Sequence, residues 1–236
     1  MPTSSIQTAE QVRDLFDQIA PHYDALNQVL SLGLHQVWKG MAVGWLDPPV
    51  GGQGLDICCG SGDLAFQMAR RVGRQGRVIG LDFSAQLLQI AARRGSLSYP
   101  GHTLQWVQGD ALALPFEDQQ FDGITMGYGL RNVTDIPQAL SEIYRVLKPG
   151  GRAAILDFQI PPDPWLQSFQ EVYLDRVVVP FAAQRGLREE YAYIMASLST
   201  FPSGIQQCEL ATKVGFSSSR FRSLMAGMMG LVIASR

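Results

Sequence analysis

The stretch LDICCGSGD at residues 55–63 joins a short apolar segment to a glycine-rich loop, with one acid inside the segment and one after the loop. Its apolar residues fit a buried strand, and the two glycines let the backbone turn sharply. Asp63 stands where a helix would begin. A strand, a glycine loop and a helix in this order typically hold a ligand at the end of a parallel sheet. The stretch therefore predicts an α/β fold with a ligand-binding loop.

Short apolar strands and helical segments alternate along residues 53–160. The predicted strands cover residues 53–58, 77–82, 104–110, 121–127 and 152–158, and the helices between them cover 64–72, 85–94 and 136–148. This alternation indicates parallel strands joined by right-handed crossovers. Residues 221–236 contain two strands close together, which predicts a hairpin. We expect a Rossmann-like, doubly wound, mostly parallel seven-stranded sheet with an antiparallel edge strand, plus N-terminal helices and a helical insertion.

The composition excludes several classes of protein. A net charge of −2 gives no basic surface for nucleic acid, and 46% hydrophobic residues over 236 positions supply one globular core. The N-terminus is polar and no apolar run is long enough to cross a bilayer, so a cytoplasmic protein is expected. Cys58 and Cys59 are two of three cysteines, which fit neither disulfides nor a metal site, and we expect packing thiols.

The two acids of the quoted stretch discriminate among the ligands that a glycine loop can hold. Gly60, Gly62 and Ala65 fit a relaxed dinucleotide fingerprint. A dinucleotide, however, would bring its pyrophosphate next to Asp56 and Asp63, which would repel it. S-adenosylmethionine carries a sulfonium and an ammonium group and no phosphate, so carboxylates are favourable beside it. The loop therefore predicts S-adenosylmethionine as the cofactor.

Acids at the ends of the next two strands fit the rest of that cofactor. Asp82 is expected to accept hydrogen bonds from the ribose hydroxyls, and Asp110 with the backbone of Ala111 is expected to reach the adenine. Each acid also has a simpler interpretation as the cap of a turn or helix, which is the usual role of Asp56 or Asp63 taken alone. Three acids at successive strand ends of one sheet favour the cofactor.

Three long stretches resemble a known family. They are YDALNQVLSLGLHQVW at 23–38, FDGITMGYGLRNVTD at 121–135 and YRVLKPGGRAAILDF at 144–158. The sequence is identified by them as a member of the ubiquinone/menaquinone biosynthesis C-methyltransferases. CCGSGDLAF, VVVP, EEYAYI and the ending MMGLVIASR are most similar to the plant and cyanobacterial branch, the demethylphylloquinone methyltransferases. The resemblance implies methyl transfer from S-adenosylmethionine to a ring carbon of a demethylated prenyl quinol, in phylloquinone (vitamin K1) or menaquinone biosynthesis.

The resemblance also implies two groups of site residues. The expected cofactor contacts, loop residues included, are Asp56, Gly60, Ser61, Gly62, Asp82, Phe83, Asp110, Ala111 and Gly127. Arg131 and Asn132, with Tyr23 and its neighbour Asp24, would face the substrate. The alternative for Arg131 and Asn132 is a structural turn with a surface ion pair to Asp135, and the alternative for Tyr23 is a packing aromatic.

The implied chemistry assigns different roles to these residues. A quinone ring is electron-poor, whereas a deprotonated quinol carries carbanion character at a ring carbon, so the substrate should be the quinol. Arg131 stays protonated, so it and Asn132 are expected to stabilise the quinolate oxygen. Asp110, a water molecule or Tyr23 could accept the proton. The alternatives are a benzoquinol of the ubiquinone pathway, a small-molecule O-methyltransferase, an NAD-dependent oxidoreductase and a noncatalytic S-adenosylmethionine-binding protein.

We divide the chain into four parts of a single methyltransferase domain (1–236): an N-terminal helical cover (1–50), a cofactor-binding core (51–160), a helical substrate lid (161–215) and an edge hairpin (216–236). The cover is expected to bury Leu34, Trp38, Met41 and Trp45. The lid carries two apolar faces. The first consists of Trp165, Phe169, Val172 and Val177, and the second consists of Leu187, Tyr191, Ile194, Leu198 and Phe201. These faces either pack on the sheet or form an apolar passage for a prenyl tail taken from a membrane, with transient peripheral contact.

Overall fold

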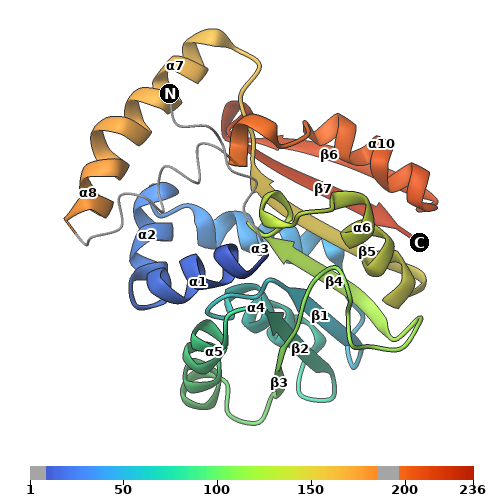
Figure 1. The fold of residues 1–236 in the computed structure, drawn as a ribbon. Coiled ribbons are helices and arrows are strands. Elements are labelled where there is room, and N and C mark those ends of the chain that lie inside the picture. The colour runs from blue at the N-terminus through green and yellow to red at the C-terminus, as the bar shows by residue number, and fades with distance from the viewer. Residues whose placement is uncertain (1–8, 185–196) are drawn as a thin grey trace.

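The computed structural model describes residues 9–184 and 197–236, which form a seven-stranded sheet with helices on both faces (Figure 1). The strands are β1 (Gln53–Ile57), β2 (Arg77–Asp82), β3 (Thr103–Gln108), β4 (Phe121–Gly127), β5 (Leu147–Phe158), β6 (Ser218–Leu224) and β7 (Met229–Ser235). Their order across the sheet is β3-β2-β1-β4-β5-β7-β6. The first five strands pair in parallel, whereas β7 is antiparallel to β5 and β6. The predicted doubly wound sheet and its final edge hairpin are confirmed.

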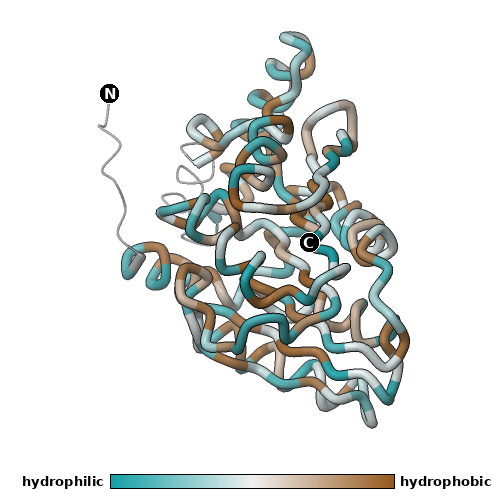
Figure 2. Tube along the Cα trace, turned by 90° about the vertical axis from the view of Figure 1, so that its right-hand side faces the viewer, coloured by the Kyte–Doolittle hydropathy of each residue, from teal (hydrophilic) through white to brown (hydrophobic). Residues whose placement is uncertain are grey.

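Helices pack on the two faces of this sheet. The α-helices are α1 (Ala9–Ile19), α2 (Tyr23–Leu30), α3 (His35–Leu46), α4 (Asp63–Val72), α5 (Ala85–Ser98), α6 (Ile136–Val146), α7 (Pro164–Tyr173), α8 (Val179–Ala183) and α10 (Gly204–Val214). In β5, Ala153 and Ile155 join the core cluster of α6 and α10, while Ala154 and Leu156 join that of α3 and α4. A central strand buried on both faces is hydrophobic along its whole length. Figure 2 shows hydrophobic residues along the strands at the centre of the molecule.

Helix α3 turns a different face to the core than its apolar residues predict. Trp38 is buried, but Leu34, Met41 and Trp45 are 40%, 36% and 45% exposed. Lys39 is buried in their place, because its ammonium lies 2.8 Å from the Asp63 carboxylate of α4. The prediction was wrong at three of four positions, since an ion pair allows a charged residue on the buried face.

Helix α7 stands away from the sheet, above α2 in Figure 1. None of its residues is buried, and Trp165, Phe169 and Val172 are 73%, 45% and 53% exposed. The interpretation that this apolar face packs on the sheet is therefore wrong. In the second predicted face Leu198 is buried, whereas Leu187, Tyr191 and Ile194 lie outside the described residues.

Helix α10 belongs to the sheet layer although the sequence places it in the lid. It packs against α6, β6 and β7, and its Ala211 is buried in their core. The part of residues 161–215 that projects from the sheet is thus α7, the π-helix η3 (Leu174–Val178) and α8. Across residues 9–184 and 197–236, no helix combines the length and the hydropathy needed to cross a bilayer.

Candidate active site

A cavity opens at the carboxyl ends of the parallel strands, beside the point between β1 and β4 where the strand order reverses. About 740 Å³ within it is free of protein atoms, and part of this space is open to solvent. Cys58, Asp82, Asp110 and Tyr128 enter it from the ends of four strands, and Tyr23 closes it from the N-terminal helices. The topology thus brings residues from five distant segments to one site.

Asp82 lies in this cavity at the end of β2 and holds the glycine loop in place. Its Oδ2 accepts a hydrogen bond from the Gly60 N–H (2.7 Å) and its Oδ1 from the Ser84 N–H (2.9 Å). Burial raises the pKa of this carboxyl, and the backbone N–H donors oppose the rise. Each oxygen keeps a further lone pair, so Asp82 can accept from ribose hydroxyls while it fixes the loop.

Tyr23 lies over the glycine loop. A Cβ atom at Gly60 would lie 3.0 Å from the Tyr23 ring, and Gly60 has a φ of +54°. A larger residue would therefore meet both a ring and a left-handed backbone. Burial raises the pKa of the Tyr23 phenol well above its usual range. Tyr23 is consequently a protonated cover of the loop and part of the cavity wall.

The charges of the cavity wall suit S-adenosylmethionine. Among the described residues that line it, Asp82 and Asp110 are the acids and Arg13 is the cation. Two acids against one cation leave a negative wall, which favours a sulfonium and disfavours a pyrophosphate. The other predicted contacts in the wall are Phe83, Ala111, Gly127, Tyr23 and Asn132.

Asp56 and Ser61 lie beside the cavity rather than in its wall. Asp56 is fully buried and accepts hydrogen bonds from the Thr125 hydroxyl (2.8 Å) and the Ala65 N–H (2.9 Å). Burial raises its pKa to about 7, although both donors oppose the rise. The Ser61 hydroxyl donates to Asp24 at 2.6 Å. The structure therefore places Asp56 as a link between β1, β4 and α4, outside the lining of the cavity.

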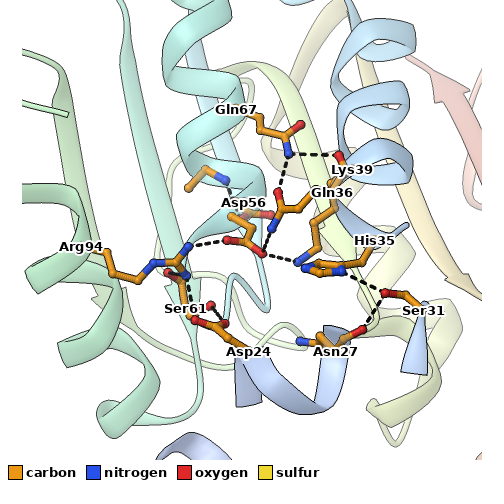
Figure 3. A network of polar contacts seen from close by, with 12 residues as sticks. Asp24, Asn27, Ser31, His35, Gln36, Lys39, Asp56, Ser61, Gln67 and Arg94 are labelled. Carbon is orange, nitrogen blue, oxygen red and sulfur yellow. Dashed lines mark hydrogen bonds and ion pairs between the residues drawn. The ribbon is translucent and has the colours of Figure 1, made fainter. Parts of the chain in front are cut away.

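A network of protein cations neutralises Asp63, the second acid of the loop. Figure 3 labels three members of this network, Gln36, Lys39 and Arg94. Lys39 and Gln36 of α3 donate to Asp63 Oδ2 at 2.8 and 2.7 Å, and Arg94 of α5 donates to Asp63 Oδ1 at 2.7 Å. Burial alone would raise its pKa, but the charges and hydrogen bonds of Lys39 and Arg94 lower it to about 2. The negative charge expected to attract the cofactor therefore comes from Asp82 and Asp110.

The Asp63 network predicts a specific loss of stability in acid. The folded-state pKa of about 2 lies below the ordinary value of 3.8 for an aspartate, so the contribution is complete above about pH 4 and disappears as the pH falls through 2. We expect protonation of Asp63 to lower the free energy of unfolding by roughly 2 kcal/mol. Urea titrations between pH 7 and 2 measure it. The double variant Lys39→Met/Asp63→Asn, which removes both buried charges, should lack this step, and an unchanged step would contradict the assignment.

Arg131 and Asp157 form a buried ion pair behind the cavity wall. Their side chains are 6% and 1% exposed, and Arg131 Nη1 donates to Asp157 Oδ1 and to the Tyr128 carbonyl, the latter at 3.0 Å. Burial raises the pKa of the Asp157 carboxyl, and the Arg131 charge opposes the rise. Asp135, the partner considered from the sequence, caps α6 instead through the Gln138 N–H. The ion pair is therefore an interior one that fixes the orientation of the guanidinium.

Three polar atoms at this wall are buried without a hydrogen-bond partner among the described residues. They are Tyr128 Oη, Arg131 Nε and Asn132 Oδ1. Asn132 Nδ2 donates to the Tyr128 carbonyl at 2.9 Å, which leaves its oxygen free. An unpaired buried polar group costs roughly 1–3 kcal/mol. Tyr128 and Asn132 line the cavity and Arg131 lies between them in sequence, so a polar ligand is a candidate partner for these atoms.

Sequence reasoning missed Tyr128, Asp157 and Lys39. Tyr128 adopts a φ of +60° and Cys58 a φ of +55°, at the ends of the adjacent strands β4 and β1. Left-handed backbone in such residues is uncommon and concentrates at functional sites. Asp157 had a sequence signal, since it is the penultimate residue of the fifth predicted strand, close to where Asp82 stands in the second. Lys39 also had a sequence signal, because it is a lone charge within the apolar run VWKGMAVGW.

The cysteines and His35 behave as packing groups. Cys58 lines the cavity and Cys59 is buried, and burial raises the pKa of both thiols well above the usual range. His35 is buried, with Nδ1 2.9 Å from the Ser31 hydroxyl, and burial lowers its pKa. Neither a thiolate nor an imidazolium is therefore available at this site near neutral pH.

Known proteins share this fold at low identity. A putative S-adenosyl-L-methionine-dependent methyltransferase from Methanococcus maripaludis is 20% identical with a TM-score of 0.64, covering 100% of this chain and 97% of that one. A possible histamine N-methyltransferase from Thermotoga maritima is 20% identical with a TM-score of 0.65, covering 95% and 99%. These structures show a Rossmann-like class I methyltransferase fold.

More similar relatives align with this chain over nearly its whole length. A 2-phytyl-1,4-naphtoquinone methyltransferase of Nostoc sp. is 54% identical over 96% of this chain and 99% of its own. The chloroplastic 2-phytyl-1,4-beta-naphthoquinone methyltransferase of Arabidopsis thaliana is 46% identical over 98% and 89%. The model of the ubiE/COQ5 methyltransferase family matches residues 4–236. The chain therefore belongs to the ubiE/COQ5 methyltransferase family, and it is a methyltransferase that depends on S-adenosylmethionine.

Proposed function

We propose that the chain methylates a ring carbon of 2-phytyl-1,4-naphthoquinol, a demethylated prenyl naphthoquinol, in phylloquinone biosynthesis. Relatives that are 54% and 46% identical carry this ring and tail in their names. The observation that carries the proposal is the group of unpaired atoms on Tyr128, Arg131 and Asn132 beside the cofactor cavity. A quinol ring offers two oxygens to such groups. S-adenosylmethionine, when bound, supplies an electrophilic methyl group on a sulfonium sulfur.

The residues of the wall suit a quinol rather than a quinone. Arg131 stays charged at any working pH, so it can stabilise the quinolate oxygen whose charge activates the neighbouring ring carbon. The Arg131–Asp157 pair holds the guanidinium before substrate arrives, which lowers the reorganisation that catalysis requires. Tyr23 keeps its proton and acts as a donor. Asp110, in the same cavity, or a water molecule is left as the proton acceptor.

The variant Tyr128→Phe is expected to lower kcat/KM without lowering the Tm. The ring would keep its stack on Phe158, with centroids 5.2 Å apart, and only the unpaired hydroxyl would be lost. We expect kcat/KM for the quinol to fall up to about tenfold. The Tm should stay equal or rise, because a buried unpaired polar group is removed. Steady-state kinetics and thermal melting measure the two effects, and an unchanged kcat/KM would show that this hydroxyl does not contact substrate.

Product analysis tests the proposed reaction directly. The protein is incubated with labelled S-adenosylmethionine and a panel of chemically reduced naphthoquinols and benzoquinols, with and without a phytyl tail. Mass spectrometry should find the label on a ring carbon of the naphthoquinols. Label on the benzoquinols alone would replace the naphthoquinol proposal with the ubiquinone-pathway alternative, and label on oxygen would indicate an O-methyltransferase. Cofactor binding with no transfer to any quinol would leave a noncatalytic role.

We also propose that α7 and α8 cover the substrate and touch the membrane that holds it. A phytyl quinol resides in lipid, since each methylene buried from water contributes about 0.8 kcal/mol. The exposed Trp165, Phe169 and Val172 of α7 supply apolar contact, with Trp165 and Phe169 stacked 6.1 Å apart. Such contact is peripheral and largely nonelectrostatic.

The membrane contact predicts a defined loss in the variant Trp165→Ser. Burying one large side chain in lipid is worth roughly 1.5–3 kcal/mol, so partition onto liposomes should fall about tenfold or more. Leu97→Ser on α5 is the control, because Leu97 is 77% exposed and Trp165 is 73% exposed. Cosedimentation measures both variants. Equal partition of Trp165→Ser and the wild type would remove α7 from the membrane contact.

A further inference from the structure

A second cavity lies between the N-terminal helices, α7 and the final hairpin, with about 520 Å³ free of protein atoms and partly open to solvent. Leu30 and Trp38 contribute to its walls from α2 and α3, Tyr173 from α7, and Met229 from β7. Figure 1 shows α7 running above α2, which places the two helical walls opposite each other. Nothing in the methyl-transfer site described above uses this cavity.

The second cavity suits a hydrocarbon. Its described lining residues are uncharged, and their polar groups are the side chains of Gln170 and Tyr173 and the indole N–H of Trp38. Gln170 and Tyr173 are already engaged, since Gln170 Nε2 donates to the Gln159 carbonyl at 3.3 Å and the Tyr173 hydroxyl to the Val29 carbonyl at 2.6 Å. The unpaired atoms of the first cavity have no counterpart here. A polar ligand would thus exchange most of its hydrogen bonds to water for apolar contacts.

One pair of stacked rings separates the two cavities. Phe158 lines the second cavity and Tyr128 the first, and their rings stack with centroids 5.2 Å apart at 29°. The Arg131 guanidinium lies 5.4 Å from the centroid of the Phe158 ring. The second cavity therefore lies on the other side of this pair of rings from the methyl-transfer cavity.

The second cavity also has an open rim and a buried floor. Leu32 and Phe169 at the rim are 56% and 45% exposed, whereas Trp38 and Met229 are 6% and 0% exposed. Three methionines, at 225, 228 and 229, line it, and methionine adapts to irregular apolar shapes. The rim adjoins Trp165, through its stack on Phe169. A flexible chain could therefore enter from the exposed face of α7.

We infer that this second cavity seats the isoprenoid tail of the quinol whose ring the first cavity holds. The inference rests on the proposed function and deepens it, because it assigns ring and tail to separate chambers. Each methylene transferred from water tightens binding roughly fourfold. The cavity thus selects long-tailed quinols over tail-less ones, and it does so at residues remote from the transferred methyl group.

Two variants test the tail cavity. Leu32→Asp places a charge at the rim, at a φ of +51° that aspartate tolerates. Its matched control is Val37→Asp, which adds the same charge at a residue 57% exposed outside the cavity lining. Leu30→Trp fills the chamber from α2. Each is assayed in detergent micelles with reduced phytyl naphthoquinone and reduced unsubstituted naphthoquinone, and folding is checked by thermal melting.

The ratio of kcat/KM for the phytyl and tail-less quinols is the first readout. We expect it to fall at least tenfold in Leu32→Asp and Leu30→Trp, as for two displaced methylenes, and to stay within about twofold in Val37→Asp. Equal losses on both substrates would overturn the tail cavity. If the wild type methylates neither quinol, the proposed function fails instead.

Binding of phytol without cofactor is a second readout, independent of turnover. Calorimetry should show phytol binding to the wild type and to Val37→Asp, and binding weakened at least tenfold in the two cavity variants. Phytol that binds all four proteins equally, or none of them, would show that the tail lies elsewhere.

Discussion

Asp82→Ala is expected to weaken S-adenosylmethionine binding roughly tenfold to hundredfold. The carboxylate lies in the cavity and can accept from the ribose hydroxyls, and hydrogen bonds to a charged group are worth roughly 1.5–3 kcal/mol. The same carboxylate accepts from the Gly60 and Ser84 N–H groups, so its removal also releases the glycine loop. Calorimetric titration of S-adenosylmethionine into the folded variant measures the dissociation constant.

Two further variants accompany Asp82→Ala, a milder change at the same residue and a control at a distant acid. Asp82→Asn keeps the shape and one acceptor oxygen but cannot satisfy both N–H donors, so we expect an intermediate loss. Asp118→Ala removes an acid whose side chain is 70% exposed and bound to Arg145, away from the cavity, and should leave binding unchanged. An unaltered dissociation constant in folded Asp82→Ala would take Asp82 out of the cofactor site.

The sheet and the position of the ligand could be predicted from sequence because their signals are local. Strands such as 77–82 and 121–127 are short apolar runs bounded by turns, and parallel pairing follows from their alternation with helices. Once the strand order reverses between β1 and β4, the site must lie at their carboxyl ends. Asp82, Asp110 and Tyr128 meet there for this topological reason.

The errors concern contacts between distant parts of the chain. Arg131 pairs with Asp157, 26 residues away, although Asp135 is nearer in sequence. Lys39 is buried because Asp63 lies opposite it across two helices, which no periodicity of α3 alone reveals. For the same reason the charge of Asp63 was assigned to the cofactor when the protein itself neutralises it. A buried ion pair depends on two segments that are distant in sequence, so it cannot be predicted from either segment alone.

Helix α7 shows a different limit of prediction from sequence. Its apolar residues have the spacing of a core helix, yet Trp165, Phe169 and Val172 are exposed. Periodicity predicts that a helix has an apolar face but not what covers that face. Our proposal is that a lipid or a lipid-like substrate covers this face, which is open beside an apolar cavity.

Arg131→Lys is expected to lower kcat by a factor of about 10²–10³, the usual cost of removing one donor to a developing oxyanion. In the wild type, Nη1 serves Asp157 and the Tyr128 carbonyl, and the buried Nε has no partner among the described residues. We propose that this Nε is the donor that meets the substrate oxygen. A lysine retains the charge but has one ammonium, which Asp157 and that carbonyl would hold. Full removal of the charge is a poorer test, because it strands a buried Asp157 at roughly 3–5 kcal/mol.

The control for this variant is a second arginine that pairs with a carboxylate and a backbone carbonyl away from the cavity. Arg145→Lys alters a guanidinium that donates to Glu142 at 2.8 Å and to the Phe116 carbonyl at 2.8 Å, and it should leave kcat unchanged. The dissociation constant of S-adenosylmethionine should stay within about twofold in both variants, since neither arginine lines the cofactor cavity. Single-turnover kinetics at saturating cofactor isolate the chemical step. If Arg131→Lys loses activity only in proportion to cofactor binding, Arg131 acts on the cofactor side, and the unpaired Nε is not the group that meets the quinolate.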